Sequence, residues 1–302
     1  MNPTSILITG GTGFLGSALA RRLSAKQYAV TVFGRDADKI RKQFGADVGA
    51  ATRFADLPDA GAFDAVVNLA GAGIFDRYWT EPRKKVLRDS RIELTRELVT
   101  WIAAGSKAPV LVNGSAIGVY GDQGDTLLSE ASPAKADFAQ QLCADWEAAA
   151  LAAADHGSRV CLIRTGLVLG RGGGLLQRML PAFRLGLGGS MGDGRQWMSW
   201  IHLEDWLAAA EAMIADPAMS GAYNATAPEP ATNREFSRTL AAVLGRPMLL
   251  PLPAFLLKLL LGEMSALVLG SQRVKPERLL AHGFQFQYSQ LRPALDAILH
   301  NS

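Results

Sequence analysis

Residues 6–16 read Ile-Leu-Ile-Thr-Gly-Gly-Thr-Gly-Phe-Leu-Gly, and this stretch decides the fold. An apolar run typical of a β-strand meets glycines at every third position, and the helix-like segment 17–23 follows. Gly10 can adopt the dihedral angles of a tight turn, Gly13 lets the backbone approach a pyrophosphate, and Gly16 lets a helix lie close to the strand. N–H groups at the start of that helix would bind a diphosphate. The order of strand, turn and helix predicts a dinucleotide site, with a glycine turn that holds no ligand as the alternative.

The composition is that of an ordinary globular protein. The chain has 302 residues, of which 49% are hydrophobic and 20% charged, enough for a sizeable core. A net charge of +3 is too small to indicate a nucleic-acid partner. Cys143 and Cys161 do not make a disulfide framework, so we expect a reducing compartment, the cytoplasm. The first apolar segment leads into the glycine turn, so we expect no signal peptide.

A second apolar stretch surrounds Lys258 and Glu263. Its uncharged runs are too short to cross a bilayer, so we expect no membrane span. A buried or groove-lining helix fits this stretch, and a helix on a membrane surface is the alternative.

Further strand-like runs alternate with helical segments along the chain. We expect strands at 29–33, 51–55, 65–71, 109–115 and 159–164. We also expect one long amphipathic helix, with Arg88 and Arg91 on a solvated face. The alternation predicts an α/β fold, a Rossmann doubly wound parallel sheet with a smaller C-terminal α+β substrate lobe. The expected NADP-binding domain spans residues 1–165, with a return at about 199–227, and the expected substrate-binding lobe spans 166–302.

The end of the second strand bears on which dinucleotide binds. In folds of this kind an acidic residue at this place binds the ribose 2′-hydroxyl of NAD. This chain has Gly34 and Arg35 there, with Lys39 one turn later. A guanidinium here favours the 2′-phosphate of NADP(H), so NAD(H) is the less expected cofactor. A solvated arginine on a loop is the alternative.

Several motifs together resemble the extended short-chain dehydrogenase/reductases, the NAD-dependent epimerase/dehydratase type. They are 9–16 (Thr-Gly-Gly-Thr-Gly-Phe-Leu-Gly), 56–57 (Asp-Leu), 68–71 (Asn-Leu-Ala-Gly), Ser115 with 119–121 (Val-Tyr-Gly), and Arg164 with Val168 and Gly170. The chain also resembles a narrower branch of this family, the YfcH-like epimerase family proteins, which have their own C-terminal domain of unknown function. This narrower resemblance rests on segments 90–92, 192–197, 199–203, 272–276 and 283–286.

The resemblance implies cofactor roles at matching positions. The residues that would hold the pyrophosphate and its helix are Gly10, Thr12, Gly13, Phe14, Leu15 and Gly16. Arg35 would contact the 2′-phosphate, and Asp56 and Leu57 would contact the adenine. The ribose would be lined by Leu69, Ala70 and Gly71, and the nicotinamide by Gly166 and Leu167.

The catalytic residues of this family are only partly present. Its members use a serine, a tyrosine that moves a proton, and a lysine four residues later that lowers the tyrosine pKa and binds ribose. Ser115 matches the serine, but none of the five tyrosines has a lysine four residues later. Anchored on Glu147, the helix expected from about 137 to 154 has Ala139 in place of the tyrosine and Cys143 in place of the lysine.

Three interpretations of the function stay open. In the first, the chain is an NADP-dependent oxidoreductase or epimerase in which Tyr120 donates the proton and Ser115 polarises the same oxygen; Tyr120 could instead simply line a pocket. In the second, the chain binds NADP without turnover, as a sensor or scaffold. In the third, a role without the cofactor dominates and the fold is inherited.

The substrate is expected to be a small molecule of unknown identity. Sugar-nucleotide enzymes of the wider family often have an arginine where this chain has Met198, which argues against a nucleotide sugar. No metal site is expected, because no set of side chains has ligand spacing. A homodimer is compatible with the sequence. The expected substrate contacts are Arg77 and Arg195 for an anion, Trp79 and Trp200 for a flat or apolar group, and His202 near the cleft.

Overall fold

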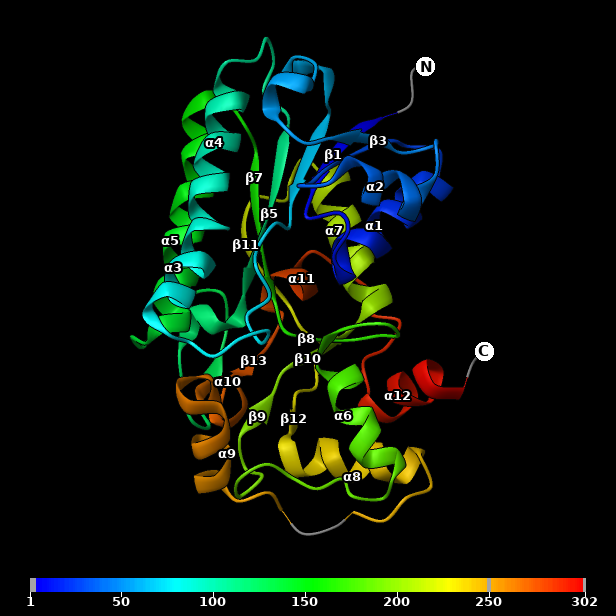
Figure 1. Ribbon diagram of the computed structural model, residues 1–302, viewed down its shortest axis with the longest axis vertical. Coiled ribbons are helices and arrows are strands. Elements are labelled where there is room, and N and C mark those ends of the chain that lie inside the picture. Colours follow the sequence, from blue (N-terminus) through cyan, green and yellow to red (C-terminus); the bar gives the residue numbers. More distant parts are fainter. Residues whose placement is uncertain (1–3, 249–250, 301–302) are drawn as a thin grey trace.

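The computed structural model describes residues 4–248 and 251–300, so the outer ends of the two predicted domains, 1–3 and 301–302, lie outside the described residues. A seven-stranded parallel sheet runs through the upper part of the molecule (Figure 1). Its order, β11-β7-β5-β4-β1-β2-β3, confirms the predicted Rossmann fold. The strands are β1 (Ser5–Thr9), β2 (Ala29–Phe33), β3 (Gly49–Ala51), β4 (Ala65–Asn68), β5 (Val110–Ala116), β7 (Val160–Thr165) and β11 (Gly221–Ala225).

Helices cover both faces of this sheet (Figure 1). One layer contains α1 (Phe14–Ala25), α2 (Ala37–Phe44) and α7 (Leu203–Ala215); the other contains α3 (Glu81–Asp89), α4 (Ile92–Ala103) and α5 (Phe138–Leu151). Alternate strand residues enter the two cores, so Ile6 and Ile8 pack toward α1 and α7, whereas Leu7 packs toward α4. Burial on both faces explains why these strands are almost wholly apolar.

A smaller lobe lies beyond the carboxyl ends of the central strands (Figure 1). Its core contains Trp200, Phe236 and Leu295. Its short strands pair as β8 (Leu167–Leu169) with β10 (Trp200–His202), β9 (Trp197–Met198) with β12 (Ala231–Thr232), and β6 (Leu127–Leu128) with β13 (Arg273–Val274). Its helices are α6 (Gly174–Arg184), α8 (Asn233–Val243), α9 (Ala254–Leu261), α10 (Ala266–Leu269) and α12 (Leu291–His300). The short helix α11 (Glu277–Ala281) instead packs against β11, and its Leu279 side chain belongs to the core of the large sheet.

Two predicted elements differ from the structure. The third strand is at 49–51 and not at 51–55, because Phe54 begins a short 3-10 helix whose ring stacks on Phe33 with centroids 4.5 Å apart. The single long helix predicted around Arg88 and Arg91 is wrong. It is broken after Asp89, where the Ser90 hydroxyl accepts the Ala72 N–H at 3.0 Å and α4 starts anew.

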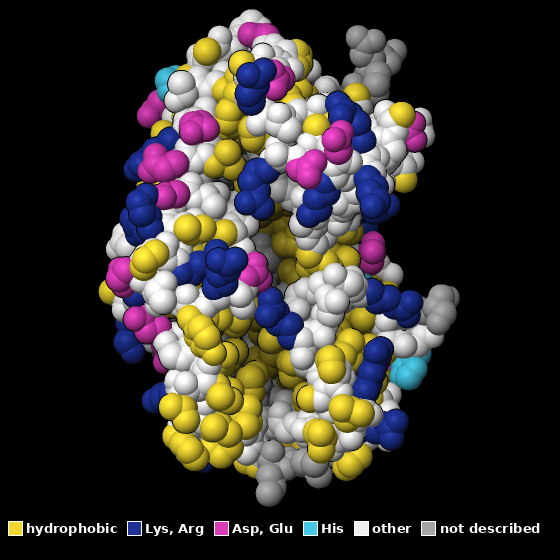
Figure 2. Space-filling view, in the orientation of Figure 1, with side chains coloured by type: hydrophobic (Ala, Val, Ile, Leu, Met, Phe, Trp, Pro, Cys, Tyr) yellow, Lys and Arg dark blue, Asp and Glu magenta, His cyan; other side chains and the backbone are white. Residues whose placement is uncertain are grey.

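No helix in the described part of the chain is both long and apolar enough to cross a membrane. The expectation of a buried helix is wrong for α9, whose Phe255 and Leu259 side chains are 72% and 78% exposed. Hydrophobic side chains accordingly gather over α9 in Figure 2. The segment that follows, from Glu263 to Val268, does line a groove, as expected.

Candidate functional site

A cavity of about 1020 Å³ lies where β1, β2 and β4 end. Its walls include 10–13 after β1, Gly34 and Arg35 after β2, and 69–73 after β4. The carboxyl ends of neighbouring parallel strands meet at one edge, which is where open α/β sheets bind ligands. Figure 2 shows Lys and Arg side chains along the margin of the hollow between the sheet and the smaller lobe.

The glycine turn shapes one wall of this cavity. Gly10 has a φ of +67°, and a Cβ there would lie 2.5 Å from the Leu69 carbonyl oxygen. A Cβ on Gly16 would lie 2.4 Å from the Gly10 carbonyl oxygen, so α1 can pack this closely only with glycine. No side chain caps the start of α1 at Gly13. The free N–H groups of this first turn suit the oxygens of a diphosphate.

A second cavity, of about 580 Å³, lies between the end of the sheet and the smaller lobe. Gly166 and Leu167 form part of its wall, together with the aromatic rings of Trp79, Phe138 and Trp197. Its charged side chains, among the described residues, are carboxylates only, on Asp137 and Glu263. We call this the apolar cavity.

Ala139 and Cys143 both line the apolar cavity. They face Gly118, at whose position a Cβ would lie 3.6 Å and 3.8 Å from their side chains. Burial raises the pKa of the Cys143 thiol to about 12, so the thiol stays protonated near neutral pH. The two residues that we predict at the positions of the family's tyrosine and lysine thus present a methyl group and a neutral thiol to this cavity.

Ser115 and Tyr120 belong to a buried hydrogen-bond network behind the cavity. The Ser115 hydroxyl donates to Glu147 at 2.6 Å, and Arg164 donates two bonds to Glu147, both at 2.9 Å. Arg164 also donates to the Tyr120 hydroxyl at 3.0 Å, and that hydroxyl donates to Asn224 at 2.7 Å. Burial raises the pKa of Tyr120. Every hydroxyl in this network already has a protein partner.

Comparison with known proteins identifies the family. The NAD dependent epimerase/dehydratase family matches residues 6–225, and the domain of unknown function DUF1731 matches residues 252–298. The chain belongs to the NAD dependent epimerase/dehydratase family. This confirms the resemblance to extended short-chain dehydrogenase/reductases, whereas the narrower YfcH-like assignment stays a prediction.

Several members of the epimerase/dehydratase family match along almost the whole chain. Human epimerase family protein SDR39U1 is 38% identical, over 97% of this chain and 99% of its own length. A chloroplastic SDR39U1 homologue from Arabidopsis thaliana is 38% identical, over 98% of this chain and 86% of its own length. The crystal structure of human SDR39U1 (isoform2) with NADPH superposes with a TM-score of 0.89 at 35% identity, covering 99% of this chain and 100% of that one.

The predicted cofactor residues of this family member fall into four groups. Those that line the first cavity are Gly10, Thr12, Gly13, Arg35, Leu69, Ala70 and Gly71. Phe14, Leu15 and Gly16 lie behind the glycine turn, and the Phe14 ring fills the space beside Gly173. Asp56 and Leu57 do not line the cavity: Asp56 is hydrogen-bonded to Arg53, which lowers its pKa, and Leu57 packs into the core. Gly166 and Leu167 line the apolar cavity instead.

Three predicted substrate residues do not reach either cavity. The Trp200 side chain is fully buried in the core of the smaller lobe, where its indole N–H donates to the Glu229 carbonyl. His202 caps the start of α7, so its ring is committed to the fold. Arg195 is exposed on a loop. Trp79 does line the apolar cavity, and Arg77 lines the first one.

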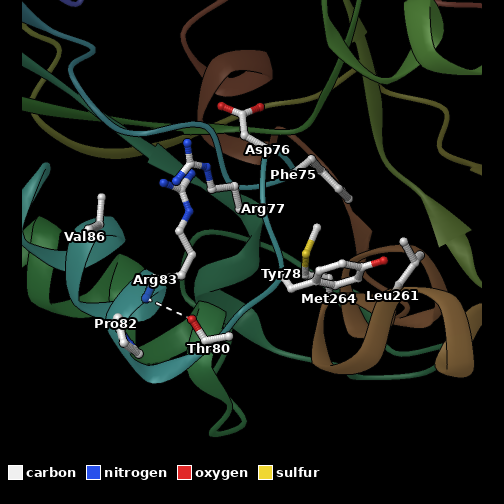
Figure 3. Close-up of a pocket in the computed structure, with 10 residues that line it drawn as sticks. All are labelled: Phe75, Asp76, Arg77, Tyr78, Thr80, Pro82, Arg83, Val86, Leu261 and Met264. Atoms are coloured by element: carbon white, nitrogen blue, oxygen red, sulfur yellow. Dashed lines mark hydrogen bonds between the residues drawn. The ribbon is translucent and has the colours of Figure 1, made fainter.

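Arg77 has a neighbour that sequence reasoning missed. In a third cavity, of about 790 Å³, the guanidinium groups of Arg77 and Arg83 lie close together, whereas Tyr78 lies beside Met264 and Leu261 (Figure 3). Arg77 and Arg83 also line the first cavity. Arg83 lies in the first turn of α3, where no periodic pattern marked it as a ligand contact.

The described residues contain no cluster of three His, Cys, Asp or Glu side chains arranged to hold a metal ion. Other groups that sequence reasoning missed are apolar wall residues such as Phe138 and Leu267, which lie far apart in the chain. Their spacing carries no signal, because the fold alone brings them together.

Proposed function

We propose that this protein is an NADP(H)-dependent oxidoreductase of the extended short-chain dehydrogenase/reductase type. One observation carries the proposal. The chain that leaves β4 lines the first cavity with residues 69–73 and then the apolar cavity with Ile74, Phe75 and Trp79. A dinucleotide in the first cavity would therefore lie next to a substrate in the second. NADP(H), when bound, supplies or accepts a hydride there.

The cofactor preference rests on the end of β2. Arg35 and Lys39 line the cavity at the place where an NAD-binding fold has an acidic residue. A planar guanidinium suits a phosphate monoester, which it can bind through two hydrogen bonds. The NADPH in the crystal structure of human SDR39U1 supports the same choice. The pyrophosphate would be held by Gly10, Thr12 and Gly13.

The apolar cavity favours an uncharged substrate. A nucleotide sugar would bring a diphosphate, with its two negative charges, beside the carboxylates of Asp137 and Glu263. Burying those charges without a cation would be strongly unfavourable. Trp79 and Trp197 instead offer flat apolar surfaces. We propose a largely apolar carbonyl or alcohol as the substrate.

Tyr120 remains our proposed proton donor, with Ser115 polarising the same substrate oxygen. The Tyr120 hydroxyl would have to exchange its bond with Asn224 for one with the substrate. Arg164 is the cation that would stabilise the phenolate, since it donates to the same oxygen at 3.0 Å. The proposal therefore requires movement of the 116–120 segment when substrate binds.

A second candidate, a non-catalytic NADP(H) sensor or scaffold, is favoured by Ala139 and Cys143. Neither side chain can move a proton near neutral pH, because one is a methyl group and the other a thiol with a pKa of about 12. Such a protein would bind the cofactor and signal its redox state without turnover.

An assay of NADPH oxidation against a panel of apolar ketones and aldehydes separates these functions. We expect turnover by the natural protein and its loss in the Ser115→Ala, Tyr120→Phe double variant. The matched control is the Ser289→Ala, Tyr28→Phe double variant, whose residues lie outside both cavities. Full turnover by the first variant would contradict our proton donor. No turnover at all, with NADPH still raising the melting temperature, would favour the sensor.

A further inference from the structure

Arg91 lies in the break between α3 and α4, facing inward. Its guanidinium fills the space beside Gly71, where a Cβ would meet its Cζ atom at 2.8 Å. On the other side it lies over the Trp146 ring, 5.3 Å from the centroid. It is also close enough to Cys143 to interact electrostatically with that thiol. Gly71 lines the first cavity and Cys143 the apolar cavity, so Arg91 stands between the two.

The Arg91 cation lacks a carboxylate partner anywhere in residues 4–248 and 251–300. Its one hydrogen bond runs from Nη1 to the Leu87 carbonyl oxygen at 3.2 Å. Two other arginines on α3 and α4 do form ion pairs: Arg88 with Asp145 at 2.6 Å, and Arg96 with Glu93 at 2.7 Å. Burial lowers the pKa of Arg91, as expected for a charge taken from water without compensation.

An unpaired guanidinium at this depth costs stability unless a ligand completes its hydrogen bonds. Its Nε and Nη2 atoms have no protein acceptor, and neither is sealed from solvent. A ligand with hydroxyl, carbonyl or phosphate oxygens, in the space beside Gly71, would satisfy both atoms.

We infer that Arg91 binds the nicotinamide half of NADP(H), as the cation that replaces the family's missing lysine. The inference rests on the proposed cofactor. The sheet order supports this half, because β4 and its Gly71 lie on the opposite side of β1 from β2, whose end carries Arg35. Cys143 stands where the lysine is expected, and Arg91 reaches the thiol from the break between α3 and α4.

Two probes test which half of the cofactor Arg91 contacts. NADPH contains both halves, whereas adenosine 2′,5′-bisphosphate lacks the nicotinamide and its ribose. We expect Arg91→Met to weaken NADPH binding by about 10- to 100-fold and to leave binding of the bisphosphate unchanged, measured by titration calorimetry on the full chain. Arg35→Met should weaken both ligands. The matched control, Arg96→Met on α4, should weaken neither.

A more conservative variant guards against misfolding. Arg91→Lys keeps the charge but loses the planar fork, so we expect NADPH affinity between those of the natural protein and Arg91→Met. Unchanged NADPH affinity in both Arg91 variants, or equal losses for the two ligands, would overturn the inference. Failure of the natural protein to bind either ligand would instead contradict the proposed function.

Discussion

At the scale of single residues, the two cavities differ in the side chains that they present. Ala139 and Cys143, which we predict at the positions of the family's proton donor and its activating cation, both line the apolar cavity. The remaining hydroxyl groups, on Ser115 and Tyr120, are held in a network with Glu147 and Arg164. The cofactor side keeps its glycines and Arg35. The predicted dinucleotide residues therefore line an open cavity, whereas the predicted proton-transfer hydroxyls are bonded to other protein groups.

The Arg35 side chain provides a test of cofactor choice at this scale. We expect Arg35→Ala to weaken NADPH by about tenfold or more and to change NADH affinity little, because only NADPH carries the 2′-phosphate. Fluorescence titration with each reduced dinucleotide measures both. A loss of the same size for NADH and NADPH would show that Arg35 does not read the 2′-phosphate. Arg41→Ala, on the neighbouring exposed face of α2, is the control.

At the scale of elements, His202 makes the start of α7 sensitive to acid. Its Nδ1 accepts the Glu204 N–H at 3.1 Å, and its ring lies 3.8 Å from that of Tyr288. Burial lowers the pKa of His202 from 6.5 to about 4. A protonated ring cannot accept this bond, and its charge would face the positive end of the helix. The neutral imidazole is therefore the form that the fold requires.

The pKa of His202 gives a pH dependence with a definite sign. The unfolded chain binds a proton on this residue below about pH 6.5, whereas the folded chain resists until about pH 4. The contribution of the neutral His202 ring to the free energy of unfolding is fully present above about pH 6.5. It falls by roughly 1–3 kcal/mol as the pH drops from about 6.5 to about 4.

His202→Asn keeps an N-cap that does not titrate, so urea unfolding of this variant should lose this part of the pH dependence. The carboxylates of the chain are the same in the variant and the natural protein, so their effect on the pH dependence cancels in the comparison. Identical pH profiles for the variant and the natural protein would contradict the assignment.

Periodicity predicted most elements, because burial on both sheet faces leaves a strong apolar pattern. It placed β2 at 29–33, as found. It failed where a single tertiary contact decides. The predicted helix is interrupted where the Ser90 hydroxyl accepts the Ala72 N–H, and Arg91 turns inward there and not to solvent. Trp200 was expected at the substrate for its chemistry, yet the lobe's own core needs that ring. Such contacts join residues distant in sequence, so local patterns do not report them.

At the scale of the whole molecule, the segment after α10 forms hydrogen bonds both with the smaller lobe and with α7 of the sheet domain. The Ser199 hydroxyl donates to the Gln272 carbonyl at 2.8 Å and accepts the Val274 N–H at 2.9 Å. The Asp205 carboxylate on α7 accepts the N–H groups of Gln287 and Tyr288 at 2.7 Å and 3.0 Å. The division into 1–165 and 166–302 stays a prediction, and these bonds join its expected return segment at about 199–227 to the end of the expected lobe.

The Ser199 bonds test how tightly the tail is coupled. Ser199→Ala leaves the buried Val274 N–H and the partly buried Gln272 carbonyl without this partner, so we expect the free energy of unfolding to fall by about 2 kcal/mol. Denaturant unfolding should still show one transition with an unchanged slope. Ser289→Ala, on the exposed part of the tail, should be neutral. A new intermediate in the Ser199 variant would instead indicate two separately folding units.

The place of β11 in the sheet has a consequence for how the chain is made. Six of the seven sheet strands lie before residue 166, but β11 pairs with β7 only after 221–225 has left the ribosome. Until then β7 is an edge strand of the sheet, and Tyr120 lacks its hydrogen-bond partner Asn224, which is 104 residues further along the chain. The glycine turn can form early, whereas the tyrosine network is completed late. During synthesis, we therefore expect the glycine turn to form before the buried Tyr120 network is complete.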